Sequence, residues 1–549
     1  MKDNKTEAQK KLRILLYIAI LSLPLLLTAA AGHRKAAFFI DEYLSYELAD
    51  HDNNGYFYVD FEDGREYTGD EAFLDSALTE RNKRFDYGNV WLNQSNDVHP
   101  PFYYALLHTV CSLTPGIFSK WQGILLNVLF GGVLLFFMYR FVFLFTGSEK
   151  AALFITLGYG LTGAFVDCGI LIRMYMMLCA EVMILSCLLY ELLFDRGKKR
   201  AVLYLLVFLT TVAGTLTQYY FLIYLFFIAL CTSLILFFAK RYRDLLLFFL
   251  TMAAAGTAAY LIFPQMIFHI FKGYRGKQSF ENLVTLGNVF FRVGRYVRSF
   301  LKNSGSLLFI PVIVLIVVLS VTEALRHGRV KDHGALMRMI PFFASSVCFI
   351  CVVAKTSPII AGRYIWCVCP VLFACVFSAF SILTAGSGLP RIIKTAAASV
   401  AVICACLTLT EGLEYDYEEF RPTVEKVAEY SDRELIYIYS PELFYATVLN
   451  YPAIRDYSSV RYYPSDDLEA DRLPLDTDEK VIIIQNDVPD REELLKKICL
   501  AGGYGHTEKL TVNDTDFDSA TWLVPCVNLP PLYKMFLRIY GCSGKTAGR

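Results

Sequence analysis

Residues 121–145 read WQGILLNVLFGGVLLFFMYRFVFLF, and this stretch decides the fold class because Arg140 is its only charged residue. A membrane span needs about 20 mostly apolar residues, so the stretch is long enough to cross a bilayer. Similar stretches recur along the chain and predict an all-α polytopic membrane protein with eleven to thirteen spans. The eleven clearest predicted spans are 14–31, 121–145, 151–169, 171–194, 201–218, 219–239, 245–268, 305–325, 339–355, 363–384 and 394–411.

The composition supports this fold class. Hydrophobic residues make up 55% of the 549 residues and charged residues 19%, whereas an average soluble protein has about 25% charged residues. The 52 basic and 52 acidic side chains give a net charge of zero, which excludes a strongly basic nucleic-acid-binding protein. The acids are segregated, with 15 in 33–98 and 26 in 411–549. We therefore predict a membrane domain, 1–411, that carries a water-facing loop, 33–98, and a soluble domain, 412–549.

The basic residues of the short connections predict the orientation. They fall on alternate connections, and the positive-inside rule then places 33–98, 271–302 and 412–549 on the extracytoplasmic side. Residues 100–114 are apolar but too short to cross, and they predict a re-entrant or interfacial helix. The first span could be a signal peptide cleaved after Ala29-Ala30-Ala31, but its long apolar run favours an uncleaved signal-anchor.

Residues 412–549 have the pattern of a small α/β domain. Short β-branched stretches predict strands at 436–440, 481–485 and 520–524, and 491–505 predicts a helix that ends at glycine. No glycine-rich phosphate loop follows a strand, so no nucleotide is indicated. The fifteen cysteines lie mostly in apolar stretches and form neither a disulfide framework nor a zinc-binding pattern.

Two motifs near the predicted extracytoplasmic face carry polar residues suited to catalysis. Asp41-Glu42 follows the first span, where a carboxylate can act as a base, a metal ligand or an ion-pair partner, and an ordinary acidic loop is the alternative. His99 precedes Pro100-Pro101 and Tyr103, where the loop returns to the membrane. The histidine suits an anion or a metal, and an interfacial anchor is the alternative.

Cations at the ends of spans form the other candidates. Arg173 with Tyr175 lies at the outer end of the fourth span, where a lone arginine usually only snorkels. Lys355 and Arg363-Tyr364 bracket a short outer connection, where positive charge favours an anionic ligand.

The loop 271–302 is strongly basic. Arg292, Arg295 and Arg298 recur every three residues among apolar side chains, a pattern typical of an amphipathic interfacial helix. Such a helix binds anionic lipid, or it forms a phosphate-binding rim for a lipid-linked substrate.

Taken in order, these motifs resemble those of the C-type (GT-C) integral-membrane glycosyltransferase superfamily. Within it they are most similar to the protein O-mannosyltransferase-like and aminoarabinose transferase-like (family 39-type) group. The likeness covers about residues 12–410, and the soluble domain carries no matching motif. The matching motifs are Asp41-Glu42, Pro100-Pro101-Phe102-Tyr103-Tyr104, Arg173-Met174-Tyr175, Thr217-Gln218-Tyr219-Tyr220 and Arg363-Tyr364.

The resemblance implies a helical GT-C bundle in a bacterial plasma membrane. It implies transfer of a hexose or pentose from a polyprenyl-phosphate carrier to an extracytoplasmic acceptor. Asp41 would be the general base or a carboxylate that orients the acceptor, with Glu42 beside it in the motif. Arg173, with Lys355 or Arg363, would hold the donor phosphate. The other candidate substrate-binding residues are His99, Tyr103, Tyr175, Gln218, Tyr219, Tyr364, Arg292 and Arg295.

Two departures from the family pattern concern the sugar and the metal. His99 stands where aminoarabinose transferases tend to have lysine, and Gln218 stands where the family often has histidine. No cofactor is indicated, and a divalent metal is left open. Membrane lipid is an expected partner, and nucleic acid is not. The sequence does not specify the sugar or the acceptor.

Two other classes of protein compete with this interpretation. A flippase or polymerase of lipid-linked glycans would place charges at the bilayer midplane and often shows inverted repeats. Here the ionisable residues cluster near one face, and no repeat is visible. A non-catalytic membrane sensor would use 412–549 for binding. Function that survives the loss of Asp41 would favour either alternative.

Overall fold

The computed structural model describes residues 2–52, 61–71, 73, 77–195, 199–285, 287, 289–327, 333–386, 391–410, 412–466, 468–475, 479–485, 488–510 and 538–545. Contacts within the chain define two compact units. Unit 1 comprises Met1–His33, Gln94–Leu107 and Ser119–Glu414. Unit 2 comprises Arg34–Asn93, His108–Phe118 and Tyr415–Arg549. Helices α4 (Tyr87–Asn96) and α5 (Phe102–Leu113) contribute residues to both units.

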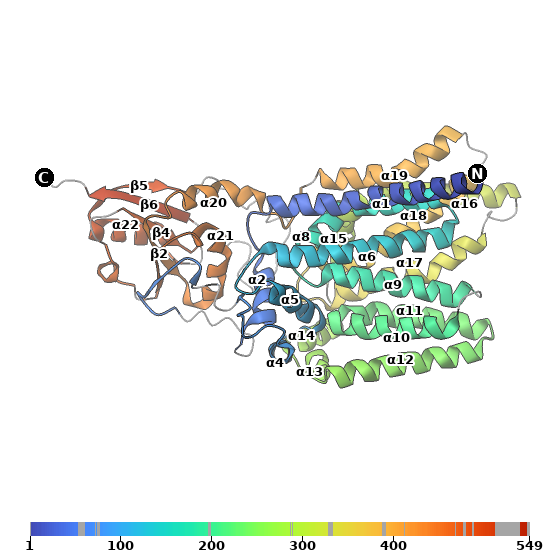
Figure 1. Cartoon of the computed structure of the whole chain (residues 1–549), viewed down its shortest axis with the longest axis horizontal. Helices are drawn as coiled ribbons and strands as arrows, with labels where there is room; N and C mark the ends of the chain where they lie inside the picture. The colour runs from blue at the N-terminus through green and yellow to red at the C-terminus, as the bar shows by residue number, and fades with distance from the viewer. Residues whose placement is uncertain are drawn as a thin grey trace. The chain divides into compact units, whose positions relative to one another are not determined.

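Unit 1 is a bundle of long apolar helices that run side by side (Figure 1). Apolar runs become helices here because a helix satisfies its own backbone hydrogen bonds in lipid. The helices are α1 (Lys2–Arg34), α6 (Lys120–Thr146), α7 (Glu149–Gly160), α8 (Gly163–Ile170), α9 (Tyr175–Phe194), α10 (Arg200–Thr217), α11 (Tyr220–Phe238), α12 (Tyr242–Ile262), α13 (Met266–Phe271), α14 (Tyr274–Val284), α15 (Val289–Phe300), α16 (Phe309–His327), α17 (His333–Thr356), α18 (Cys369–Gly386) and α19 (Arg391–Leu409), with a π-helical turn η1 (Leu301–Gly305) and a 3₁₀ helix η2 (Gly362–Val368).

The predicted polytopic helical architecture is confirmed, and the chain is a multi-pass membrane protein. Among the described residues, eight helices are long and apolar enough to cross a membrane, or up to ten if each of two bent pairs is one span. The predicted spans at 151–169 and 305–325 fall on these pairs, which bend by 58° between α7 and α8 and by 93° between η1 and α16. The predicted span at 394–411 falls on α19, whose described apolar part is short. Residues 100–114 contain the short apolar helix α5, and its re-entrant or interfacial placement stays a prediction.

Unit 2 contains a sheet with the strand order β1-β3-β2-β4-β6-β5. Strands β3, β2 and β4 are parallel, and β1, β6 and β5 pair antiparallel. The predicted small α/β fold is confirmed by β2, β4 and the helix α22, whereas 520–524 lies outside the described residues. The elements are β1 (Glu66–Tyr67), β2 (Glu434–Tyr439), β3 (Val460–Pro464), β4 (Lys480–Ile484), β5 (Tyr504–Lys509), β6 (Arg538–Lys545), α2 (Ile40–Asp50), α20 (Arg421–Ala428), α21 (Tyr451–Ile454), α22 (Arg491–Gly502), η3 (Glu418–Phe420), η4 (Pro441–Asn450) and η5 (Ala470–Arg472).

Both faces of this sheet are buried, which explains the continuous apolar pattern of its parallel strands. On one face, alternate side chains of β2 and β4 form a core cluster with α22. On the other face, Tyr437 lies beside Tyr462, with ring centroids 5.4 Å apart. Phe61, from the acidic loop, stacks on Tyr462 at 3.8 Å. Aromatic residues of the loop therefore form part of the core of unit 2.

The acidic loop also adds a strand to the sheet. Strand β1 pairs with β3 in the register Glu66↔Arg461 and Tyr67↔Val460. Arg461 Nη2 lies 3.0 Å from Glu66 Oε2, and Arg461 Nε lies 2.6 Å from Glu434 Oε1 at the start of β2. One arginine thus joins three strands, and the loop and the C-terminal segment fold as one unit.

The first turn of α2 is anchored to the C-terminal segment of the same unit. The Nζ of Lys35 lies 2.9 Å from Glu42 Oε2, and both side chains are fully buried. Lys35 Nζ also donates to Tyr415 O at 2.5 Å. Glu42 Oε2 accepts from the Phe39 backbone N–H at 2.6 Å, a capping interaction at the start of the helix.

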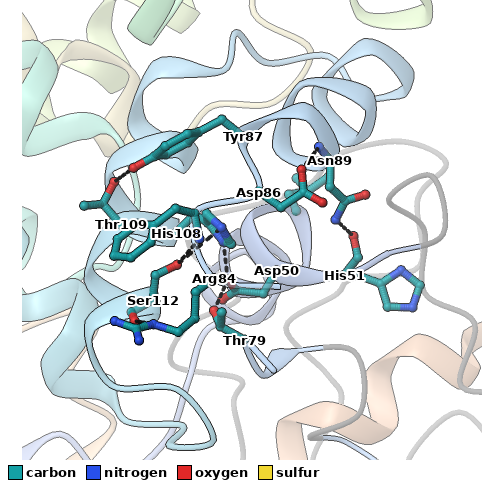
Figure 2. A network of polar contacts seen from close by, with 12 residues as sticks. Asp50, His51, Thr79, Arg84, Asp86, Tyr87, Asn89, His108, Thr109 and Ser112 are labelled. Carbon is teal, nitrogen blue, oxygen red and sulfur yellow. Dashed lines mark hydrogen bonds and ion pairs between the residues drawn. The ribbon is translucent and has the colours of Figure 1, made fainter. Parts of the chain in front are cut away.

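The other end of α2 joins a buried polar network (Figure 2). Asp50 Oδ1 lies 2.8 Å from His108 Nδ1, and His108 Nε2 lies 3.3 Å from Ser112 Oγ. Serine, histidine and carboxylate in this order resemble a hydrolase triad. However, the side chains of His108 and Asp50 are 3% and 0% exposed, so a substrate does not reach them. We interpret the network as structural.

Candidate active site

The candidate residues of unit 1 lie at one end of the helix bundle because consecutive spans run antiparallel. The turns α8–α9 and α10–α11 and the segment from α17 to η2 share this end, where α13 and α14 also lie (Figure 1). These segments carry Arg173, Tyr219 and Arg363.

Helix α6 fixes the turn that carries Arg173. Asn127 Nδ2 donates to Leu171 O at 2.7 Å and to Gly169 O at 3.3 Å, so carbonyl groups at the end of α8 are satisfied. Gly123, one turn earlier on α6, lies directly against Ile172: a Cβ at this position would come within 2.0 Å of Ile172 Cγ2. The turn is therefore held by packing and hydrogen bonds, and the Arg173 side chain is buried.

His99 lies beside Arg173 and is oriented by Asp97. Helix α4 ends at Asn96, and Pro100 keeps His99 out of helical geometry, since a residue directly before proline avoids it. Asp97 Oδ2 lies 2.7 Å from His99 Nδ1 and accepts from the His99 backbone N–H at 3.2 Å. Arg173 Nη2 lies 3.3 Å from His99 Nε2. A carboxylate, an imidazole and a guanidinium thus form a continuous row.

The Asp97 carboxylate is negatively charged in this setting. Its burial acts to raise its pKa, but its interactions with His99 and the charge of Arg173 outweigh burial and lower the pKa below its usual value.

A second histidine, His269 of α13, lies near this row. Its Nδ1 lies 3.0 Å from Tyr219 Oη, and its Nε2 lies 3.3 Å from Ser95 O. Because a carbonyl only accepts, Nε2 carries the proton, and the Tyr219 hydroxyl donates to Nδ1. Burial lowers the pKa of His269, which agrees with a neutral ring.

Arg363 is the second buried arginine at this end of the bundle. Its guanidinium lies 5.4 Å from the ring of Tyr364, and Tyr364 packs against Tyr220 at 5.4 Å. Tyr220 follows Tyr219 directly, so this motif contributes one tyrosine to the group around Arg363 and one to the group around His269. The structure thus brings together residues from motifs far apart in the sequence.

Three further candidates are buried side chains near helix ends. Tyr175 packs against Trp366 with ring centroids 6.0 Å apart. Gln218 is buried at the end of α10, where its backbone N–H donates to Gly214 O at 3.2 Å. Tyr103 is buried at the start of α5, with its ring 5.8 Å from Tyr104.

The basic residues around α15 have different environments. Arg292 faces inward, where its Nε donates to Ala354 O at 2.6 Å and its Nη2 to Ser357 Oγ at 2.9 Å, so it caps the end of α17. Arg295 lies over the ring of Phe291, and Arg298 is exposed. Lys355 Nζ donates to Thr285 O. The predicted amphipathic helix is present, but its arginines are not equivalent.

Asp41 and Glu42 belong to unit 2, in the first turn of α2. Glu42 is buried with Lys35, whereas Asp41 is partly exposed. The two carboxylates of the motif therefore have different environments: Glu42 fastens the start of the helix, and Asp41 keeps part of its surface exposed.

Sequence reasoning missed Asp97 and His269. Asp97 was one of many acids in its loop, although its position two residues before His99 was a usable signal. His269 stands in an apolar stretch and gives no signal of its own. Within the described part of the chain, no group of three or more His, Cys, Asp or Glu side chains is arranged to hold a metal ion.

Comparison with solved structures identifies the architecture. The chain is similar to the crystal structure of ArnT from Cupriavidus metallidurans bound to undecaprenyl phosphate, with a TM-score of 0.52 and 11% identity over 88% of this chain and 94% of that chain. ArnT is an aminoarabinose transferase of the GT-C type. The chain has a GT-C fold.

The GT-C resemblance of the sequence motifs is thus confirmed at the level of the fold. The apo structure of the same ArnT matches with 11% identity and a TM-score of 0.48, over 89% of this chain and 95% of that chain. No family model and no curated protein sequence matches the chain.

Proposed function

We propose that the protein is a membrane glycosyltransferase that moves a sugar from a polyprenyl-phosphate carrier to an acceptor. The observation that carries the proposal is the GT-C fold, shared along 88% of the chain with an ArnT structure that holds undecaprenyl phosphate. The ordered motifs of the sequence support it, because they include a carboxylate after the first span and cations at the ends of later spans.

The proposed reaction is a substitution at the anomeric carbon of the sugar. A bond forms between an acceptor oxygen and this carbon, and the bond between the carbon and the phosphate oxygen breaks. The departing polyprenyl phosphate gains negative charge, and the acceptor loses a proton. The protein must therefore supply cations for the phosphate and a base for the proton.

We assign the cation role to Arg173, with Arg363 or Lys355 as a second ligand, and place His99 beside it. A guanidinium suits this role because it can form two parallel hydrogen bonds to one phosphate. Burial of Arg173 and Arg363 supports the assignment, since charge is worth more where water is excluded.

We assign the base role to Asp41. Its partial exposure at the start of α2 leaves it accessible, while the buried ion pair of Glu42 with Lys35 holds the helix. By the distribution of basic loops, this site and the C-terminal α/β fold would be extracytoplasmic.

A transfer assay with labelled polyprenyl-phosphate sugars tests the proposal. Asp41→Asn should lower turnover about 10²–10⁴-fold, the usual contribution of a general base. Asp63→Asn, at an acidic position elsewhere in the same loop, is the matched control and should retain activity. No transfer from any such donor by the wild type, or near-normal transfer by Asp41→Asn, would contradict the proposal.

A further inference from the structure

Two histidine–carboxylate pairs occur among the described residues, and one of these two is partly exposed. The pair His108–Asp50 of unit 2 is sealed, and Ser112 occupies the second ring nitrogen of His108 (Figure 2). In the pair His99–Asp97 of unit 1, the side chains are 21% and 16% exposed. The second nitrogen of His99 faces Arg173 rather than a neutral group.

The partners of His99 define where its proton lies. Arginine has donors only, so the 3.3 Å contact requires His99 Nε2 to accept from Arg173 Nη2. The proton is then on Nδ1 and is donated to Asp97 Oδ2 at 2.7 Å. The imidazole is neutral in this arrangement, because a proton on Nε2 would point at the guanidinium.

An anion bound at Arg173 favours a proton on His99 Nε2, whereas Arg173 alone disfavours it. An unprotonated phosphate oxygen has lone pairs only, so it can bind His99 Nε2 only if that nitrogen carries a proton. The phosphate would also separate the two cations and neutralise their repulsion. Asp97, already hydrogen-bonded to Nδ1, stabilises the imidazolium that results.

The other groups facing this pair do not compete for the proton. His269 donates from Nε2 to Ser95 O and accepts from the Tyr219 hydroxyl, so both of its nitrogens are engaged as a neutral ring. The ring of Tyr104, 6.4 Å from that of His99, packs on its side. In the described part of unit 1, the titratable and charged groups with an interaction to His99 are Asp97, Arg173, His269 and Tyr104.

We propose that His99 takes up one proton when a phosphate headgroup binds beside Arg173, and that Asp97 is the positioning residue that makes this uptake favourable. The identity of the ligand, the headgroup of a polyprenyl phosphate, rests on the proposed function. Binding is therefore linked to pH: it is strongest at low pH and weakens as pH rises. One proton taken up corresponds to a change of up to about tenfold per pH unit.

The experiment measures the affinity of the purified full-length protein for undecaprenyl phosphate between about pH 5 and 8, the range in which histidine ordinarily titrates. Calorimetry in buffers of different ionisation enthalpy counts the protons taken up. We expect about one proton for the wild type. His99→Lys should keep affinity and lose both the uptake and the pH slope, because lysine stays charged. His99→Gln should lose both affinity and uptake.

Asp97→Asn should weaken binding and diminish the uptake, while His33→Gln, at an exposed histidine of unit 1, should change neither. Inorganic phosphate as a competitor separates the possible sources of the ligand. If inorganic phosphate displaces the lipid and causes the same proton uptake, the site accepts any phosphate. If only undecaprenyl phosphate causes proton uptake, the lipid chain is required. Polyprenol without phosphate should cause no uptake.

Proton uptake that persists in His99→Lys, equal uptake with polyprenol, or a wild type without uptake would overturn the inference. These results are separate from the test of catalysis. Sugar transfer combined with pH-independent donor binding would leave the proposed function standing and remove only the role of His99 as a proton acceptor.

Discussion

Replacing Lys35 with methionine tests how α2, the helix that carries Asp41, is held in place. The Lys35–Glu42 pair is fully buried, with 2.9 Å between the charged atoms. Removing one partner of such a pair leaves a buried charge without its counterion and costs about 3–5 kcal/mol. Methionine keeps the length and apolar stem of lysine, so little of this loss would come from packing.

The matched control is Lys83→Met in the same unit. Lys83 pairs with Asp52, but both side chains are about one third exposed, and such pairs contribute about 0–1 kcal/mol. The double variant Lys35→Met/Glu42→Gln removes both buried charges and keeps an acceptor for the Phe39 N–H. It should recover most of the lost stability, because a buried pair replaced by neutral groups is often nearly neutral in energy.

Hydrogen exchange of the α2 amides measures the free energy of local opening. Protection in Lys35→Met should fall by roughly two to three and a half orders of magnitude, at about 1.4 kcal/mol per tenfold change. The turnover number should fall as well, with little change in donor KM, because the base and not the phosphate ligands would be displaced. Protection in Lys35→Met equal to that in Lys83→Met would refute the reasoning, as would a double variant no better than the single one.

Three further predictions concern other parts of the chain. Gly123→Ala should displace the turn that carries Arg173 and lower activity strongly. Gly132→Ala on the same helix is the control and should be tolerated, because a Cβ there meets its nearest atom at 3.6 Å. Transfer assays and thermal unfolding distinguish the two variants. Arg292→Gln should lower the free energy of unfolding by about 1.5–3 kcal/mol, because its hydrogen bonds at the end of α17 are lost. Arg298→Gln should change the free energy of unfolding by no more than about 0.5 kcal/mol and raise the donor KM at low salt. A cysteine at exposed Ser458 should react with a membrane-impermeant reagent in intact cells, and one at Lys240 should not; the reverse pattern would invert the predicted topology.

The membrane architecture could be predicted because lipid leaves the backbone few choices. Long apolar runs must be helical there, and their length fixes most of their ends. The prediction was less accurate where helices break. The apolar stretch 305–325 predicts one span, but the helix that precedes α16 meets it at an angle of 93°. No periodic pattern of apolar residues reports such an angle.

The candidate site was predicted only in part, for a related reason. His99, Arg173 and Tyr219 stand in short motifs, which sequence can show. Their partners Asp97 and His269 come from a polar loop and a short apolar helix, and only the folded chain brings them within hydrogen-bonding distance. The distinct roles of Asp41 and Glu42 were likewise hidden, since adjacent carboxylates look alike until one is seen buried against a lysine.

The pairing of β1 with β3 has a consequence for how the protein is synthesised. Glu66 and its partner Arg461 are 395 positions apart in the chain. At about 5–20 residues per second, the ribosome needs roughly 20–80 s to deliver the second strand after the first. During this time Phe61, Tyr67 and Phe73 lack the tyrosine face against which they pack in the finished protein. The early loop must therefore be kept from aggregating while all the spans between are inserted, and a nascent chain that stops before residue 460 never completes the sheet.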